Sequence, residues 1–162
     1  MPSAGGHWRR PDRGLRSQPV DEVVIRRAIA ADAAGIAALL GELGYPAPAA
    51  AIPGRLERLA GETGQSVLVA QLDGQVVGLA SVFTRHDITD DAAFARLAAL
   101  VVRGDRQGEG VGRALVEAAE AIARSAGCRV IEVTSGDHRP GAHAFYRRLG
   151  FEERPRRFIK RL

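Results

Sequence analysis

The 162-residue sequence is poor in several features, and each shortage excludes a class of protein. Cys128 is its only cysteine, so no internal disulfide can form, and no pair of His or Cys residues has the spacing of metal ligands. No apolar run approaches the ~20 residues that a membrane-spanning helix needs. The first 20 residues also lack the apolar segment of a secretory signal. We therefore expect a cytoplasmic protein that uses no metal and does not associate with a membrane.

The excess of positive charge is confined to the beginning of the chain. Four arginines and one aspartate in the first 20 residues contribute +3 of the formal net charge of +4. These residues mix Gly, Pro and Ser without periodicity, so residues 1–20 are predicted to be a disordered basic arm. The nearly neutral remainder, residues 21–162, is long enough for one domain. Its charge does not indicate nucleic-acid binding, although association with nucleic acid through the arm stays an alternative.

The hydrophobic pattern predicts the element order β-α-α-β-β-β-α-β-α-β. Strands are expected over 22–28, 66–72, 75–85, 93–102, 130–134 and 158–162, with a hairpin turn at Asp73-Gly74 and a polar loop over 86–92. Helices are expected from an N-cap at Asp32 to Gly44, from about Pro53, over 111–124 and over 140–149. The strand-helix-strand unit over 93–135 predicts a right-handed crossover between parallel neighbours.

A glycine-rich heptad lies between an apolar strand and a helix: Gln107-Gly108-Glu109-Gly110-Val111-Gly112-Arg113. Glycines let backbone N–H groups turn toward a ligand, and the N-terminus of a helix favours negative charge, so the pattern predicts a phosphate site. It is no dinucleotide-binding fingerprint, because the third glycine would fall at Arg113 or Leu115. It is no Walker A loop either, because Lys160 is the only lysine.

Two motifs together resemble the GNAT family of N-acetyltransferases. Residues 107–112 fit its loop signature Gln-x-x-Gly-x-Gly, and residues 142–151 fit its second signature, Ala-x-x-Phe-Tyr-x-x-Leu-Gly-Phe. The second motif follows the first after one helix and one strand, as in the family. The resemblance covers most of residues 21–162 and implies a single N-acetyltransferase domain. It also implies an α/β (α+β) fold with a mixed, mostly antiparallel central sheet, a β-α-β crossover and flanking helices.

The resemblance further implies acetyl-CoA as co-substrate and assigns residues to it. The CoA pyrophosphate would lie on Gln107, Gly108, Glu109, Gly110, Val111, Gly112 and Arg113. Pantetheine would run along the strand at Leu100-Val101-Val102, whose backbone would also polarise the thioester carbonyl. Tyr146 stands where the family keeps a proton donor for the departing thiolate. Arg139 stands where relatives often have an asparagine that touches the cofactor; it either pairs with a CoA phosphate or faces solvent.

The general base is not identified by the sequence. Many relatives carry a glutamate near the position of Ala98 and Ala99, and that carboxylate is missing here. The remaining candidates are Glu132, His138, His86, Asp87 and a chain of water molecules.

The sequence therefore predicts direct transfer of an acetyl group from acetyl-CoA to a primary amine of a small molecule or a peptide. A non-catalytic module that binds CoA and regulates another process is the alternative. The acceptor is left open, and a homodimer is compatible with the sequence. The almost exclusive use of arginine as the basic residue is typical of a bacterial, GC-rich coding sequence.

Overall fold

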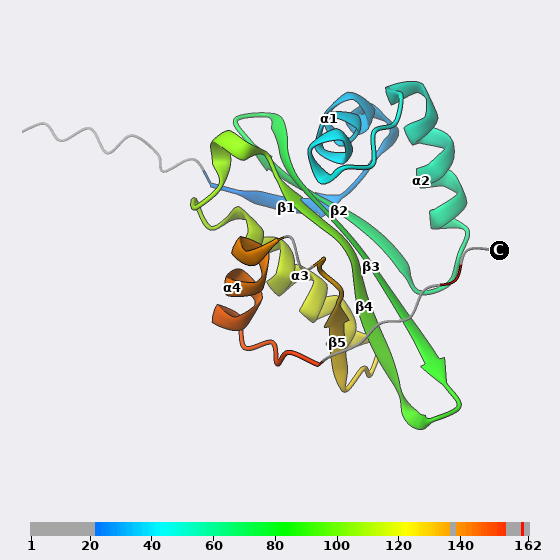
Figure 1. Cartoon of the computed structure of the whole chain (residues 1–162). Helices are drawn as coiled ribbons and strands as arrows, with labels where there is room; N and C mark the ends of the chain where they lie inside the picture. Colours follow the sequence, from blue (N-terminus) through cyan, green and yellow to red (C-terminus); the bar gives the residue numbers. More distant parts are fainter. Residues whose placement is uncertain (1–21, 137–138, 155–159, 161–162) are drawn as a thin grey trace, which may run out of the picture.

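A computed structural model describes residues 22–136, 139–154 and 160 (Figure 1). The strands are β1 (Val24–Arg27), β2 (Gln65–Leu72), β3 (Gln75–Asp87), β4 (Asp90–Val102) and β5 (Val130–Val133). The helices are α1 (Ala33–Leu43), α2 (Ile52–Ala60), α3 (Val111–Ser125) and α4 (Pro140–Arg148), with 3₁₀ turns η1 (Ala30–Asp32), η2 (Ala49–Ala51) and η3 (Gly104–Arg106). Their order is the predicted one. The predicted arm, residues 1–20, and all of the predicted strand over 158–162 except Lys160 lie outside the described residues.

The five strands form one sheet in the order β1-β2-β3-β4-β5. β1 to β4 pair antiparallel, whereas β5 pairs parallel to β4 after the crossover through α3. This confirms the predicted mixed, mostly antiparallel sheet with a β-α-β crossover. The β2–β3 hairpin turns through Asp73 and Gly74, whose φ angles of 51° and 75° are those that a tight two-residue hairpin turn requires.

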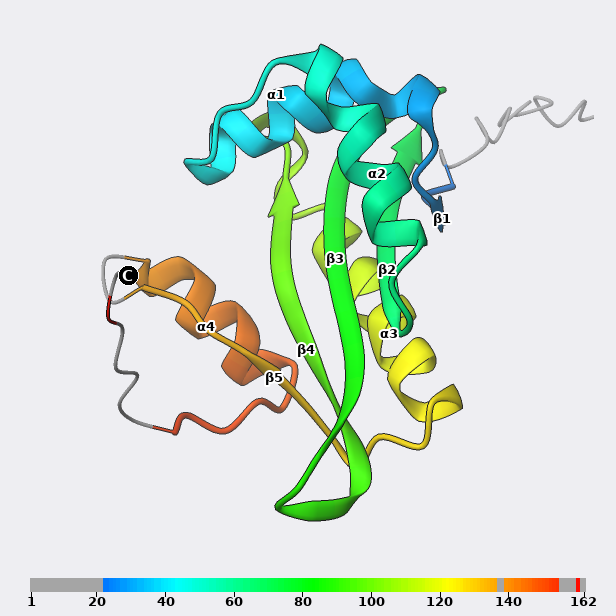
Figure 2. The same ribbon diagram turned by 90° about the vertical axis from the view of Figure 1, so that its right-hand side faces the viewer.

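The helices cover the two faces of this sheet, α1 and α2 on one side and α3 and α4 on the other (Figures 1 and 2). Ile36, Leu39 and Ile52 pack on Val69 and Leu79 under α1 and α2. On the other face, the apolar stripe of α3 packs against alternate residues of β2, β3 and β4. No helix in the described ranges has the length and apolar character needed to cross a membrane.

The predicted polar loop over residues 86–92 is wrong. β3 runs on to Asp87 and β4 begins at Asp90, which leaves a two-residue turn. The rings of Phe83 and Phe94 meet edge to face across the two strands, with their centroids 6.5 Å apart. This end of the hairpin extends past the helices (Figure 2), so its side chains are exposed. A strand that no helix covers has no need of alternating apolar residues, which is the signal that strand prediction uses.

Asp32 is the N-cap residue of α1, as predicted, but its side chain makes no hydrogen bond to that helix. Its carboxylate instead accepts the N–H of Ile29 at 2.8 Å. It also accepts two hydrogen bonds from the Arg26 guanidinium, at 2.7 and 2.8 Å. Only 6% of the Asp32 side chain is exposed. The pair therefore connects β1 to the start of α1, with the carboxylate buried and the guanidinium partly exposed.

We expect Asp32→Ala to lower the free energy of unfolding by about 2 kcal/mol at neutral pH, less than for a fully buried pair because Arg26 is 31% exposed. The hydrogen bonds from Arg26, and then from Ile29, hold the pKa of the Asp32 carboxyl below its ordinary value. Stability from such a group is present above the unfolded-state pKa, near 4, and is lost as the pH falls through the folded-state pKa. Urea titrations should show the two proteins converging below about pH 4. A difference that is independent of pH would contradict the assignment.

Gly78 on β3 faces α3 at a point where a side chain has no room. A Cβ there would lie 2.9 Å from Cδ1 of Leu115 and 3.1 Å from Cγ1 of Val111, both on the buried side of α3. We expect Gly78→Val to destabilise the fold by about 2–3 kcal/mol, because it forces the helix and the sheet apart. Thermal unfolding would measure this as a lower Tm. The matched control is Gly54→Val, where a Cβ would meet nothing within 4 Å; equal effects at both sites would refute the steric explanation.

Candidate functional site

β4 pairs with β5 over only part of its length. Residues 94–97 of β4 lie beside Val130–Val133. Beyond Leu97, β4 continues to Val102 without a partner on β5, and Figure 2 shows the two strands running apart. This separation leaves an edge of β4 whose backbone groups have no strand partner among the described residues, and a ligand can satisfy them.

The hydrogen-bond pattern decides which backbone groups face this gap. The N–H of Arg103 donates to the C=O of Val77 on β3 at 2.8 Å. Hydrogen-bonded and non-bonded pairs alternate along antiparallel strands, so the register also bonds Val101 to β3. Leu100 and Val102 therefore turn their N–H and C=O groups away from β3, toward the gap. Of the predicted segment Leu100-Val101-Val102, the first and last residues thus offer their backbone groups to a ligand.

A β-bulge in β4 lies where the strands separate. The register between β3 and β4 shifts between the pairs made by Leu97 and Ala99, so Ala98 has no partner on β3. A bulge bends its strand and leaves the extra residue unpaired. The sequence analysis missed it, because residues 97–102 are all apolar and show no break in an alternating pattern. The structure shows it in the packing. Leu97 and Leu100 both pack into the core under α3, whereas residues three apart in a regular strand lie on opposite faces.

The glycine-rich heptad forms the turn between β4 and α3. Gly108 and Gly110 have φ angles of 86° and 83°, which residues with side chains rarely adopt. Gly110 is the N-cap of α3, and a Cβ at either glycine would meet nothing within 4 Å. The turn is therefore open in front of the N-terminus of a 15-residue helix, an arrangement that suits a phosphate.

Three further residues of the heptad, Gln107, Val111 and Gly112, differ in what surrounds them. Gln107 is exposed, and its Nε2 donates to the C=O of Val102 at 3.3 Å. The side chain of Val111 is buried in the core, so it can offer a ligand only its backbone. Gly112 lies against α4, where a Cβ would be 3.3 Å from the Phe145 ring. The absence of a side chain at Gly112 therefore permits the close approach of α3 and α4.

The two charged residues of the heptad form ion pairs at the surface. Glu109 lies 3.6 Å from Arg106, and Arg113 lies 4.0 Å from Glu117 on the next turn of α3. Exposed pairs of this kind contribute little to stability. Little free energy therefore opposes a movement of the Arg113 guanidinium toward a phosphate.

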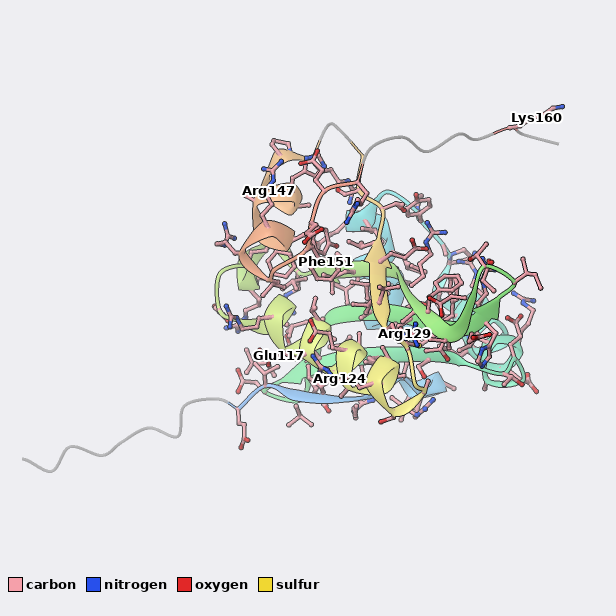
Figure 3. The ribbon with its side chains drawn as sticks, turned by 90° about the horizontal axis from the view of Figure 1, so that it is seen from below. Glu117, Arg124, Arg129, Arg147, Phe151 and Lys160 are labelled. Carbon is pink, nitrogen blue, oxygen red and sulfur yellow. The ribbon has the colours of Figure 1, made fainter. Side chains whose placement is uncertain are left out.

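Tyr146 lies in the second half of α4, in a group of aromatic rings. Its ring centroid is 5.2 Å from that of Phe145 and 5.4 Å from that of Phe151, which Figure 3 shows between α4 and β5. Burial raises the pKa of the Tyr146 phenol, and the charge of Arg139 opposes this with a smaller effect. The phenol is therefore protonated at neutral pH, which is the state that a proton donor needs.

Arg139 is the N-cap residue of α4 and reaches another helix. Its Nη2 donates to the C=O of Leu43 at 2.6 Å. This carbonyl is at the C-terminus of α1, where Gly44, with a φ of 95°, ends the helix as predicted. The contact of Arg139 with a CoA phosphate stays a prediction, whereas its contact with α1 is present in the structure.

The candidates for the general base lie in different parts of the molecule. Glu132 on β5 is opposite Arg96 of β4, with which it forms an ion pair of 3.3 Å, and its side chain is 49% exposed. His86 and Asp87 lie at the end of β3, at the opposite end of β4 from the glycine-rich turn. His138 lies outside the described residues. Of the candidates in the described ranges, Glu132 is nearest to the point where β4 and β5 separate.

Neither thiol chemistry nor metal chemistry is supported by the described residues. Burial raises the pKa of the Cys128 thiol, which makes the reactive thiolate scarcer at neutral pH. In the part of the chain that the structure describes, no three His, Cys, Asp or Glu side chains gather as metal ligands.

Comparison with known proteins connects this site to an activity. The sequence model of the Acetyltransferase (GNAT) family matches residues 39–151. Aminoglycoside N(6')-acetyltransferase type 1 of Stenotrophomonas maltophilia is 39% identical over 135 residues, which cover 82% of this chain and 88% of that protein. Aminoalkylphosphonate N-acetyltransferase of Salmonella typhimurium is 32% identical over 94 residues, which cover 58% of this chain and 61% of that protein.

Solved structures share the fold. The aminoglycoside N-acetyltransferase AAC(6')-Iy in complex with CoA has a TM-score of 0.78 at 22% identity, over 88% of this chain and 95% of its own. An acetyltransferase of Trypanosoma brucei has a TM-score of 0.71 at 27% identity, over 87% of this chain and 100% of its own. The family match spans more than half of the chain and includes both motifs, at 107–112 and 142–151. The chain therefore belongs to the GNAT acetyltransferase family and is an acetyl-CoA-dependent N-acetyltransferase.

Proposed function

We propose that this enzyme transfers the acetyl group of acetyl-CoA to a primary amine of a small polyamino acceptor of the aminoglycoside class. The observation that carries the proposal is the juxtaposition of three parts: the open glycine-rich turn before α3, the unpaired edge of β4, and the helix α4 that carries Tyr146. They meet at Gly112, where a Cβ would lie 3.3 Å from Phe145 of α4 and 3.6 Å from Val102 of β4. The acceptor class is supported by the Stenotrophomonas relative, whose similarity extends over most of both chains. The single cysteine, Cys128, fits the reducing cytoplasm in which we place the enzyme.

The cofactor would lie along the edge left by the separating strands. The backbone N–H groups from Gly108 to Gly112 would hold the pyrophosphate, with Gln107 and Arg113 beside it. Pantetheine would hydrogen-bond to Leu100 and Val102 as an added strand. The register that turns these two residues toward the gap supports this placement.

The reaction makes one bond and breaks one. The amine nitrogen attacks the thioester carbon, so a C–N bond forms and the C–S bond breaks. Negative charge that develops on the carbonyl oxygen needs N–H donors, and the bulge at Ala98 supplies unpaired backbone beside the gap. Tyr146 gives its proton to the departing thiolate, and the second proton that the nitrogen loses as the amide forms restores the phenol, directly or through water. The proton of the ammonium passes to Glu132 or to water, and the position of Glu132 on β5 supports the former.

A CoA-binding module without turnover is the second candidate. It is favoured by β4 itself, where residues 97–102 are all apolar and offer no carboxylate as a base. A thiol-release assay with acetyl-CoA separates the two, with an aminoglycoside, a linear polyamine, an aminoalkylphosphonate and a lysine peptide as acceptors. We expect release with the aminoglycoside. Tight binding of acetyl-CoA without release in the presence of any amine would establish the module, and release with the peptide alone would replace the acceptor class.

A further inference from the structure

The last turn of α1 is held from two sides by residues that are distant in the sequence. On one side, the Glu42 carboxylate accepts the N–H of Gly104 at 2.9 Å. On the other side, Arg139 donates to the C=O of Leu43 at 2.6 Å. Gly104 follows the end of β4, and Arg139 stands at the start of α4, which follows β5. The end of α1 therefore connects the two segments that come after the separating strands.

The Arg139 contact is favourable for reasons that do not depend on a ligand. The last carbonyls of a helix have no partner within the helix, and a cation at this end interacts favourably with the helix dipole. The hydrogen bond is charge-assisted and partly buried, which makes it stronger than a neutral one. Arg147 on the same helix differs, because it pairs with Glu153 at the surface, where both side chains are more than half exposed. The hydrogen bond of Arg139 is thus the stronger of the two interactions.

This contact joins two parts that the proposed reaction needs. α1 and α2 cover the face of the sheet opposite α3 (Figures 1 and 2). If the cofactor enters the gap from the glycine-rich turn before α3, the acceptor must reach the thioester from the face that α1 and α2 cover. α4 carries Tyr146 two turns after Arg139. We propose that Arg139 is a positioning residue, which fixes the end of α1 relative to Tyr146 and thereby shapes the acceptor side of the site. This inference rests on the proposed function.

The charge of Arg139 also acts on Tyr146. It lowers the pKa of the phenol against the larger, raising effect of burial. A lower proton affinity makes transfer of the proton to a thiolate easier.

The test compares Arg139→Met and Arg139→Lys with the matched control Arg147→Met, which removes an exposed arginine of α4 (Figure 3). Arg139→Met should raise KM for the acceptor roughly tenfold and leave the Kd of acetyl-CoA within about twofold. Arg139→Lys, which keeps the charge and a donor, should restore KM to within about threefold of the original value. Arg147→Met should change neither quantity. A pattern in which the Kd rises and KM does not would make Arg139 a cofactor contact and overturn the proposal.

A second readout needs no substrate and separates this inference from the proposed function. The amides of Gly44 and Tyr45 donate to the carbonyls of Gly41 and Leu40 at the end of α1. Hydrogen exchange at these amides should quicken roughly five- to tenfold in Arg139→Met and in Glu42→Ala, and stay unchanged in the Arg147→Met control. If no amine is acetylated but this exchange pattern appears, the proposed function fails, and the role of Arg139 in holding the end of α1 is supported. If the exchange rates of these amides in Arg139→Met equal those of the unaltered protein, that role is refuted whatever the activity.

Discussion

Tyr146→Phe is expected to lower kcat by roughly 10²–10⁴-fold and to leave the Kd of acetyl-CoA nearly unchanged. The substitution removes only the hydroxyl, so the ring contacts with Phe145 and Phe151 remain. Without the phenol, the CoA sulfur must depart as an unprotonated thiolate. Steady-state kinetics for kcat and calorimetry for Kd measure the two effects separately.

The pH dependence gives a second check on Tyr146. Burial raises the pKa of its phenol, so the proton donor stays protonated to a higher pH than an exposed tyrosine would. In the unaltered enzyme, we expect kcat to fall when the pH rises above the ordinary phenol pKa of about 10. In Tyr146→Phe, this fall of kcat at alkaline pH should be absent. If Tyr146→Phe weakens acetyl-CoA binding and preserves kcat, Tyr146 is a packing or binding residue instead of the proton donor.

Gly110→Glu is expected to weaken acetyl-CoA binding by about 4 kcal/mol, the size of one charge repulsion at 4 Å near a protein surface. Gly110 is the N-cap of α3 in the open turn, where an added Cβ would meet nothing within 4 Å. A glutamate there would occupy the space of the pyrophosphate and add a negative charge. The fold should survive, because the positive φ costs a residue with a Cβ only about 1–2 kcal/mol.

Two matched variants separate the causes at Gly110. Gly110→Ala has the same backbone strain with little bulk, and Gly110→Gln has the bulk of glutamate without its charge. Calorimetry should rank the affinities for acetyl-CoA as Ala, then Gln, then Glu. The difference between Gln and Glu should shrink in high salt, because salt screens an exposed charge. Equal affinities for all three variants and the unaltered protein would exclude the glycine-rich turn as the pyrophosphate site.

The order of the elements, the glycine-rich turn and the position of Tyr146 could be predicted because each depends on local pattern. Gly44 and Gly110 end or begin helices through their own φ angles, and Asp73-Gly74 forms a tight turn without help from distant residues. The failure over residues 86–92 has a local cause as well, since an uncovered hairpin carries no apolar alternation.

Only the tertiary structure decided which backbone groups and side chains from distant segments of the chain meet. The register of β3 against β4 places the bulge at Ala98 and turns Leu100 and Val102 toward the gap, and register depends on pairing rather than on composition. The same holds for Arg139, whose partner, Leu43, is 96 residues away. A sequence indicates by itself which elements occur and in what order, because those choices rest on a few neighbouring residues. Contacts between strands and between helices need the folded chain, because only packing brings their partners together.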